Sequence, residues 1–270
     1  MIAGADSGRN AADIAAGRRV GKPVTIELRG VCKDFGGLRA VDDVSATATP
    51  GQVLGIAGPN GAGKTTLFDT ISGLTSMTAG TVLLGDVSLD GLTVHQRCRL
   101  GLARTFQQPT VAGSLSAFEN VRVARRYGRA SDHWTGCSDA RDDVDWVLER
   151  CQLSHVADRP AELLSVFDKK RLMLATGLAT GPRAILFDEP FGGLNPEEIE
   201  VTLALIREVA ALDVAVICIE HVMRALVRLA SRVLVMHHGR SFFEGTPAEM
   251  MRDERVIEIY LGKRRADVDE

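Results

Sequence analysis

Long apolar segments are absent from this sequence. No apolar run approaches the roughly 18 to 20 residues that a membrane-spanning helix needs, and the run 214–219 has only the length of a strand. The N-terminus carries Asp6, Arg9 and Asp13 and has no apolar segment of the signal-peptide type, so secretion is not expected. If the protein works at a membrane, we expect it to do so as a peripheral subunit.

The cysteines and the charges exclude further classes. The five cysteines are scattered and form no Cys-x-x-Cys pair, which predicts reduced thiols in a cytosolic protein and no zinc site. The net charge of −3 and the pI near 6.1 leave no basic excess, whereas a broad nucleic-acid-binding face is normally basic. No Asn-Lys-x-Asp stretch is present to select guanine. We therefore expect neither a nucleic-acid partner nor a GTPase.

What the sequence does contain is a glycine-rich turn that ends in lysine. Residues 58–66 read Gly-Pro-Asn-Gly-Ala-Gly-Lys-Thr-Thr and match the pattern GxxxxGK[ST]. A strand-length apolar run, 53–57, precedes the turn, and a helix is predicted for 64–72 with Gly73 at its end. Backbone N–H groups of such a turn point at phosphate oxygens, and the positive end of the helix faces the same anion. The turn therefore predicts a nucleoside triphosphate site.

Each residue of this phosphate loop has an expected role. Lys64 would reach the outer phosphates, and the Thr65 hydroxyl would ligate Mg²⁺. The other residues would form the cradle around the phosphates: Gly58, Pro59, Asn60, Gly61, Ala62, Gly63 and Thr66. The alternative is a turn that contains Gly-Lys-Thr by coincidence, and the predicted strand and helix on either side argue against it.

A second motif follows an apolar strand in the later half of the chain. Residues 184–187 read as a buried strand, and Asp188 and Glu189 come directly after it. At the carboxyl end of such a strand, Asp188 would bind Mg²⁺ directly or through water. Glu189 would orient and deprotonate the attacking water. A solvated Asp-Glu pair is the alternative, but the phosphate loop favours the catalytic interpretation.

The histidines differ in their sequence context. His221 lies two residues after the apolar run 214–219. A lone histidine is usually structural, but its place after a core strand favours a γ-phosphate sensor. His237 and His238 precede Gly239 in a predicted hairpin turn, so we assign them no chemistry.

The predicted elements indicate an α/β fold, a P-loop NTPase (RecA-like) core with two additions. Apolar strands that alternate with helices indicate a parallel sheet covered on both faces. Residues 24–52 and 80–90 read as short strands of a flanking antiparallel β-subdomain. Residues 131–143 are polar and loop-like, and the apolar residues that follow them have helical spacing, which indicates an inserted helical subdomain. Those residues are Val144, Val147, Leu148 and Cys151.

The domain boundaries follow from these changes in pattern. The N-terminal tail has no apolar periodicity and is expected to be disordered. The expected boundaries are 23–108 and 181–263 for the nucleotide core, 109–180 for the helical lobe, and 1–22 and 264–270 for the tails of a domain spanning 23–263.

Together these motifs resemble the ATP-binding subunit of ABC transporters, over nearly the whole chain from about residue 25 to 263. Within that family the chain resembles the ATPases of branched-chain amino acid importers. The matching stretches are 35–38, 40–41, 104–107, 188–190, 193–198, 219–221, 244–247 and 260–262. The resemblance implies an ATPase that uses ATP and Mg²⁺ and lies peripherally on the cytoplasmic face of the cell membrane.

The resemblance also implies roles outside the two motifs. Phe35 would stack on adenine, where many members use tyrosine, and Val41 would belong to the same site. Gln107 would sense Mg²⁺ and the γ-phosphate and would join the core to the helical lobe, which meets the membrane subunits. Asn195 replaces a usual aspartate and Val222 a frequent one, and neither change removes a catalytic group.

One departure from the family pattern concerns the signature, Leu-Ser-Gly-Gly-Gln. The corresponding residues here are Leu164, Ser165, Val166, Phe167 and Asp168. In the family this loop meets the γ-phosphate bound by the opposite subunit, and its glycines permit close backbone approach. Val166 and Phe167 add side chains there, and Asp168 brings a negative charge toward an anion. We expect this signature to serve its partner's nucleotide poorly.

The altered signature predicts a heterodimer with one competent site. This chain would supply Lys64, Asp188, Glu189 and His221, and a paralogue would supply an intact signature; a homodimer is the alternative. The other partners implied are transmembrane permease subunits and, indirectly, a solute-binding protein.

The sequence leaves the transported solute open. Importers of branched-chain amino acids, urea or short amides would look alike, and a lipopolysaccharide-type exporter is a more distant alternative. An ATPase-impaired partner subunit and a soluble ABC ATPase outside transport are further alternatives.

Overall fold

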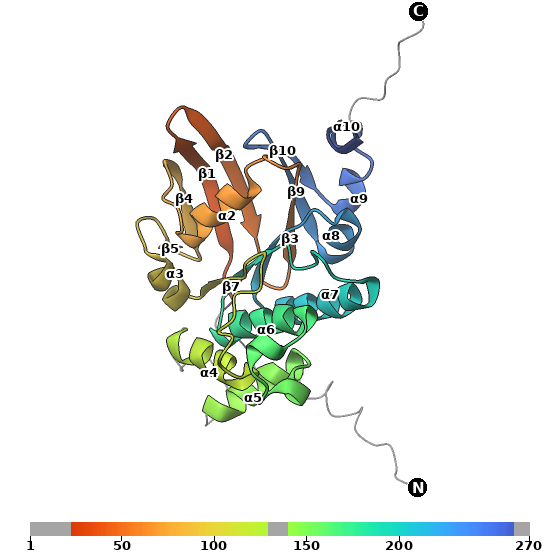
Figure 1. The fold of residues 1–270 in the computed structure, drawn as a ribbon. Coiled ribbons are helices and arrows are strands. Elements are labelled where there is room, and N and C mark those ends of the chain that lie inside the picture. Colours follow the sequence, from red (N-terminus) through yellow and green to blue (C-terminus); the bar gives the residue numbers. More distant parts are fainter. Residues whose placement is uncertain (1–22, 129–139, 262–270) are drawn as a thin grey trace, which may run out of the picture.

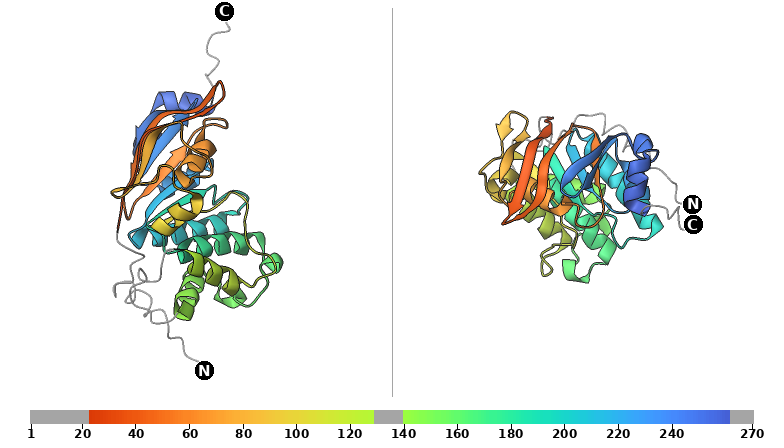
Figure 2. Two further views of the ribbon diagram at one scale, coloured as in Figure 1. Left: turned by 90° about the vertical axis from the view of Figure 1, so that its left-hand side faces the viewer. Right: turned by 90° about the horizontal axis from the view of Figure 1, so that it is seen from above.

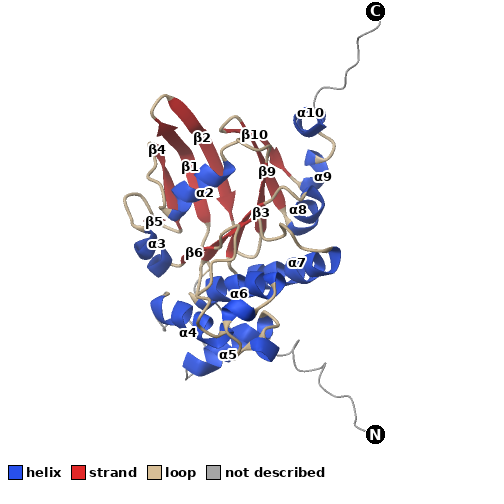
Figure 3. Cartoon of the chain, in the orientation of Figure 1, coloured by secondary structure: helices blue, strands red, loops and turns tan. Residues whose placement is uncertain are grey.

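The computed structural model describes residues 23–128 and 140–261. The expected tails 1–22 and 264–270 lie outside the described residues, as does most of the polar stretch 131–143. Within the described part, several helices gather at one end of the strands, and other helices lie beside or between the strands (Figure 3).

The larger of two sheets contains the predicted core strands. Its strands are, in spatial order, β10 (Arg240–Gly245), β9 (Arg232–His237), β3 (Val53–Ala57), β8 (Ala215–Ile219), β7 (Ala184–Asp188) and β6 (Leu102–Arg104). From β9 to β6 the neighbours are parallel, and β10 pairs antiparallel with β9. Successive residues of β7 pack into different core clusters, Ile185 and Phe187 into one, Ala184 and Leu186 into the other. The expected parallel sheet, buried on both faces, is confirmed (Figure 1).

The smaller sheet is the predicted antiparallel β-subdomain. Its spatial order is β2 (Leu38–Ala48), β1 (Ile26–Phe35), β4 (Ala79–Leu84) and β5 (Val87–Ser88). Helix α2 (Lys64–Ser72) follows the phosphate loop and ends at Gly73, as predicted. Leu67, Phe68 and Ile71 of this helix are fully buried among apolar residues of both sheets. Their burial fixes the helix, and with it the phosphate loop, between the two sheets.

The inserted region is helical. It contains α4 (Ala117–Tyr127), α5 (Ala140–Arg150) and α6 (Val166–Ala179), with short 3₁₀ turns at Ser154–Val156 and Ala161–Leu163. The predicted helix is α5, and its apolar residues are buried against the rest of this lobe. Figure 2 shows the lobe, in green, extending from one end of the two sheets.

The polar stretch 131–143 is not a loop throughout. Helix α5 already begins at Ala140, which corrects the expectation. The reason is that Asp142 and Asp143 lie in its first turn, where the helix dipole favours negative charge. The Asp143 carboxylate also forms a buried ion pair, 2.8 Å long, with Arg125 of α4.

The remaining helices lie against the larger sheet or against the helices that cover it. Helix α7 (Pro196–Ala211) follows its N-cap Asn195, whose side-chain oxygen accepts from the Glu198 N–H. Helices α3 (Val94–Leu100), α8 (Met223–Leu229), α9 (Pro247–Met250) and α10 (Glu254–Leu261) complete the fold. Within 23–128 and 140–261, no helix combines the length and the apolar character that crossing a membrane requires.

Candidate nucleotide-binding and catalytic site

The phosphate loop runs from the end of β3 into α2 and is enclosed by its neighbours. Gly58 has φ of 145° and Gly63 has φ of 95°. A Cβ atom at Gly58 would lie 2.3 Å from the carbonyl oxygen of Met236, and one at Gly63 would lie 2.3 Å from that of Ala40. Both positions therefore require glycine, for the backbone conformation and for the close approach.

The Lys64 side chain is folded over the loop. Its ammonium donates to the carbonyl oxygens of Gly58 (2.7 Å) and Pro59 (3.0 Å). Burial lowers the pKa of Lys64, while the nearby carboxylates of Glu189 and Asp188 act in the opposite direction. The cation thus lies between the loop and the carboxylates, where the phosphates of a bound nucleotide would have to lie.

A cavity of about 690 Å³ lies over the loop. It is lined by Phe35, Leu38, Arg39, Ala40, residues 60–66, Glu189, His238 and Gly239. Phe35 of β1 is half exposed, and its ring centre lies 4.8 Å from Lys33 Nζ. Val41, expected at the same site, does not line the cavity and is fully buried in the core.

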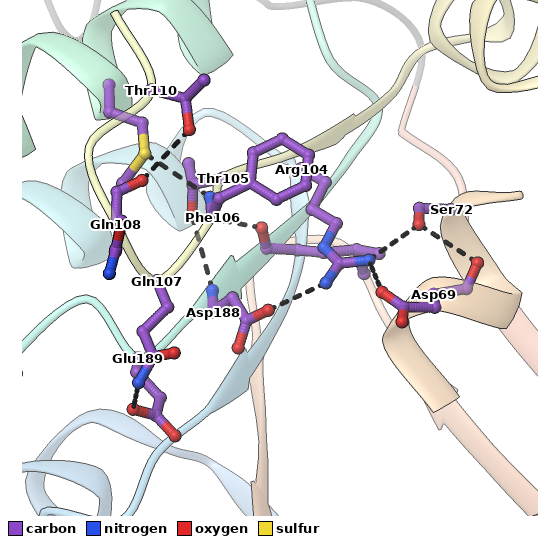
Figure 4. A network of polar contacts seen from close by, with 12 residues as sticks. Asp69, Ser72, Arg104, Thr105, Phe106, Gln107, Gln108, Thr110, Asp188 and Glu189 are labelled. Atoms are coloured by element: carbon purple, nitrogen blue, oxygen red, sulfur yellow. Dashed lines mark hydrogen bonds and ion pairs between the residues drawn. The ribbon is translucent and has the colours of Figure 1, made fainter. Parts of the chain in front are cut away.

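Glu189 is where the predicted catalytic residues meet. Its Oε2 atom accepts a 2.7 Å hydrogen bond from Gln107 Nε2 and lies 3.3 Å from His221 Nδ1. Figure 4 shows the side chain of Gln107 in contact with that of Glu189, the residue that follows the end of β7. Glu189 has φ of +48°, a conformation that costs energy for a residue other than glycine and that recurs at functional sites. Three segments far apart in the sequence therefore converge on one carboxylate.

Asp188 has a partner that sequence reasoning missed. Its Oδ2 atom accepts a 2.9 Å hydrogen bond from Arg104 Nη2, and both side chains are less than one tenth exposed. Burial raises the pKa of Asp188; the hydrogen bond from Arg104 lowers it, and the charges of Glu189 and Asp69 raise it. The available signal was an arginine after the apolar residues 102–103, next to the stretch that contains Gln107.

Two more missed residues support the loops around Glu189. The fully buried Glu220 carboxylate accepts from the N–H groups of Phe191 (2.8 Å), His221 (3.1 Å) and Val222 (3.1 Å). Burial raises the pKa of Glu220, and these hydrogen bonds lower it. Lys170 Nζ donates to the carbonyl oxygen of Gly192 at 2.6 Å. A charged residue at the end of an apolar strand was the signal for Glu220; Lys170 had none.

The hairpin between β9 and β10 is the predicted turn, and it also borders the cavity over the phosphate loop. His238 in this turn has φ of +49° and lines the cavity, although the sequence suggested no role for it. The next residue, Gly239, donates its N–H to the Ala62 carbonyl at 3.1 Å. This turn therefore packs directly against the phosphate loop.

The altered signature is not an open loop. Ser165 is the N-cap of α6, so Val166, Phe167 and Asp168 form the first turn of a helix. Ser165 Oγ accepts from the Asp168 N–H (3.0 Å) and donates to Asp168 Oδ2 (2.8 Å). Asp168 also pairs with Arg171, whose guanidinium lies 4.4 Å from the centre of the Phe167 ring.

The negative charge expected at Asp168 has partners within its own helix turn. Partial burial alone would raise the pKa of Asp168, but the hydrogen bonds from Arg171 and Ser165 hold it below its usual value. The carboxylate is therefore ionised and balanced within its own helix turn. The Val166 side chain, by contrast, is 64% exposed, at a position where the family signature has a glycine.

The expected Mg²⁺ ligands suit the ion. Thr65, Gln107 and Asp188 offer a hydroxyl, an amide and a carboxylate oxygen, and Mg²⁺ prefers such hard oxygen ligands. In the described part of the chain, no three His, Cys, Asp or Glu side chains gather into a metal site. A site with few protein ligands fits an ion that binds together with phosphates and water.

Comparison with known proteins identifies the family. A family model described as ABC transporter matches residues 41–192, more than half of the chain. The chain belongs to the ATP-binding subunits of ABC transporters. Members of this family are ATPases, so the expected family and enzyme class are confirmed.

Individual relatives cover nearly all of this ABC subunit. LivG of Escherichia coli, a high-affinity branched-chain amino acid transport ATP-binding protein, is 34% identical over 249 residues, 88% of this chain and 98% of LivG. LptB of Escherichia coli, a lipopolysaccharide export system ATP-binding protein, is 29% identical over 239 residues, with the same coverage of 88% and 98%.

The fold and the C-terminal segment have matches of their own. The crystal structure of the ADP conformation of MJ1267, an ATP-binding cassette of an ABC transporter, has a TM-score of 0.78 at 27% identity. The match covers 90% of this chain and all of that one. A second family model, described as a branched-chain amino acid ATP-binding cassette transporter, matches residues 242–266 of this ABC subunit.

Proposed function

We propose that this ABC subunit hydrolyses Mg²⁺-bound ATP to drive the import of branched-chain amino acids or related small polar solutes. The proposal for the solute is supported by the match of residues 242–266 to a branched-chain amino acid cassette model and by the similarity to LivG. The proposal for the chemistry is carried by one observation, the convergence of Gln107 and His221 on the Glu189 carboxylate.

The residues around the cavity divide the work of hydrolysis. Lys64 and the N–H groups of residues 58–66 hold the phosphates, and the Phe35 ring stacks on the adenine. Thr65, Asp188 and Gln107 would hold Mg²⁺, and the bound ion would supply positive charge that offsets the negative charge of the phosphates. Glu189 orients the water that attacks the γ-phosphate in line and accepts its proton.

His221, which lies next to Glu189, senses the γ-phosphate. Its ring is about half exposed, so it can contact both the carboxylate and a γ-phosphate. Gln107 donates to the same carboxylate oxygen and connects the core to the helical lobe. We infer that binding of the triphosphate rearranges these contacts and thereby reports the nucleotide to the lobe.

The altered signature favours an asymmetric assembly. The first turn of α6 presents Val166 and Phe167 where close backbone approach to a phosphate is needed, so this chain serves its partner's nucleotide poorly. A paralogue with an intact signature would complete this chain's own site. ATP then favours the closed dimer, and product release reopens it. The dimer lies on the cytoplasmic face of the membrane, below permease subunits that receive solute from a binding protein.

Two alternatives have their own support. The similarity to LptB favours an exporter of lipopolysaccharide type. The altered signature favours an ATPase-impaired partner subunit. The identity of the permease separates importer from exporter, and turnover in the complete complex separates a working subunit from an impaired one.

The test is purification of the membrane complex through a tag on this chain, followed by identification of its subunits. We expect permease subunits, a second ATP-binding subunit with an intact signature, and turnover that rises when a solute-binding protein loaded with leucine, isoleucine or valine is added. The purified chain alone should hydrolyse ATP feebly, and Lys64→Ala should weaken its ATP binding. Brisk turnover by the homodimer would refute the asymmetric assembly, and lipopolysaccharide-export partners would refute the importer.

A further inference from the structure

A buried arginine connects the elements that carry two of the expected Mg²⁺ ligands, Thr65 on α2 and Asp188 at the end of β7. Arg104 is the last residue of β6 and lies opposite Leu186 in the parallel register with β7. Its Nη2 atom donates to Asp188 Oδ2 at 2.9 Å, and its Nη1 atom donates to Asp69 Oδ1 at 2.7 Å. Figure 4 shows the guanidinium between the end of β7 and helix α2.

The guanidinium has little freedom to turn. Nη1 also donates to Ser72 Oγ at 2.9 Å, so α2 holds it at two points. The Phe68 and Phe106 ring centres lie 5.6 and 5.1 Å from its central carbon. Because a guanidinium is planar and rigid, anchors at both terminal nitrogens fix the direction of each hydrogen bond.

The contact selects one oxygen of Asp188. Arg104 occupies Oδ2, and within the described residues no hydrogen bond reaches Oδ1. The Arg104 guanidinium bridges the Asp69 and Asp188 carboxylates. The Arg104 cation lowers the repulsion among these groups and leaves Oδ1 of Asp188 for another cation.

The other anchor lies on the same face of α2 as Thr65. Asp69 follows Thr65 by four residues, which places both on one side of the helix. A bridge from Asp69 to Asp188 therefore sets the separation between the helix that carries Thr65 and the strand end that carries Asp188.

We propose that Arg104 is a positioning residue for the Mg²⁺ that accompanies ATP, a role that rests on the proposed nucleotide site. It holds Asp188 in one orientation and ties the β7 end to the first turns of α2. Outer partners that orient a metal ligand typically contribute about 10- to 100-fold to metal affinity. The opposite role, a cation that competes with Mg²⁺ for Asp188, predicts tighter Mg²⁺-dependent binding once the arginine is removed.

The experiment measures ATP affinity of the purified chain by calorimetry, once with Mg²⁺ and once with EDTA. In Arg104→Met, the gain in affinity that Mg²⁺ provides should fall about 10- to 100-fold, while metal-free ATP affinity stays near that of the unchanged chain. Arg104→Lys keeps the positive charge but not the two-pronged guanidinium. Compared with Arg104→Met, it should therefore restore part of the gain in ATP affinity that Mg²⁺ provides. An unchanged or larger gain in Arg104→Met would overturn the proposal.

Arg97→Met is the matched control. Arg97 is 3% exposed and also holds α2, through the carbonyl oxygens of Thr70 (2.8 Å) and Ile71 (2.6 Å), but it touches no carboxylate of the site. It should leave the Mg²⁺-dependent gain unchanged; equal losses in both variants would mean that Arg104 merely supports the helix, and would overturn the proposal.

If Arg104→Met does not fold, Arg104→Lys and Asp69→Asn take its place: each weakens one side of the bridge and should reduce the Mg²⁺-dependent gain, and no reduction in either overturns the proposal. If the unchanged chain binds ATP without any gain from Mg²⁺, the proposed nucleotide site itself fails, a result distinct from a failure of Arg104.

Discussion

The surroundings of Glu189 and the first turn of α6 are built in opposite ways. At Glu189, side chains from distant segments meet: Gln107 follows β6, and His221 follows β8. In the α6 turn, Ser165, Asp168 and Arg171 bond to one another at a spacing of three residues. The first arrangement leaves polar groups facing a cavity, and the second satisfies its polar groups internally.

This difference concerns which polar groups are free to act on a ligand. A group that must act on a ligand needs hydrogen-bonding capacity that its neighbours do not use. Glu189 keeps this capacity, since its contacts are with an exposed amide and a half-exposed imidazole. Asp168 does not keep it, because its carboxylate is bonded to Arg171 and Ser165. This contrast supports the proposal that the chain supplies catalytic groups to its own nucleotide and presents a closed surface to its partner's.

The largest effect should come from Glu189→Gln in the complete complex. The amide cannot accept the proton of the attacking water, so turnover should fall by about 10²–10⁴-fold while ATP binding persists. Steady-state ATPase assays and nucleotide titration measure the two quantities. If Glu189→Gln leaves turnover unchanged, hydrolysis takes place only at the other subunit's site. The Glu189 region would then not be catalytic, and its contrast with the α6 turn would not reflect catalysis.

A smaller gain should follow from rebuilding the signature. The triple change Val166→Gly, Phe167→Gly and Asp168→Gln opens the turn to a partner's phosphate, so turnover by the purified chain should rise, on the order of tenfold. Lost transition-state hydrogen bonds of this kind typically cost 10²–10³-fold, and we expect only part to be recovered.

The control for the rebuilt signature is the same triple change combined with Lys64→Ala, which should abolish the gain. A rebuilt chain that remains as slow as the original would show that its poor turnover has another origin than the α6 turn.

The smallest effect should come from Ser165→Ala. It removes the cap of α6 and should cost about 1 kcal/mol of stability, a decrease in Tm of roughly 2–4 °C. Ser116→Ala is the matched control, because Ser116 caps α4 in the same lobe by the same bond to the third residue of its helix. Similar decreases are expected for both variants. A Tm left unchanged by Ser165→Ala, with a sharp loss of turnover in the complete complex, would show that this turn still acts on the partner's nucleotide.

Much of the nucleotide site could be predicted because it is local in sequence. The conformation of residues 58–66 depends on its own glycines and on the strand and helix next to it, and the start of α7 depends on Asn195, Pro196 and Glu198. Local conformations of this kind depend on residues that are close together in the sequence. The positions of the core strands along the chain could be predicted for the same reason, since each buried strand has its own apolar run.

Tertiary structure alone decided which distant side chains meet. The β6 and β7 register brings Arg104 to Asp188, the packing of α2 brings Asp69 to the same guanidinium, and the β9–β10 turn brings His238 to the phosphate loop. By itself, the sequence determined the phosphate loop, the carboxylate pair and the class of fold. It could not determine these contacts, because each depends on the spatial order of strands and helices that are far apart along the chain.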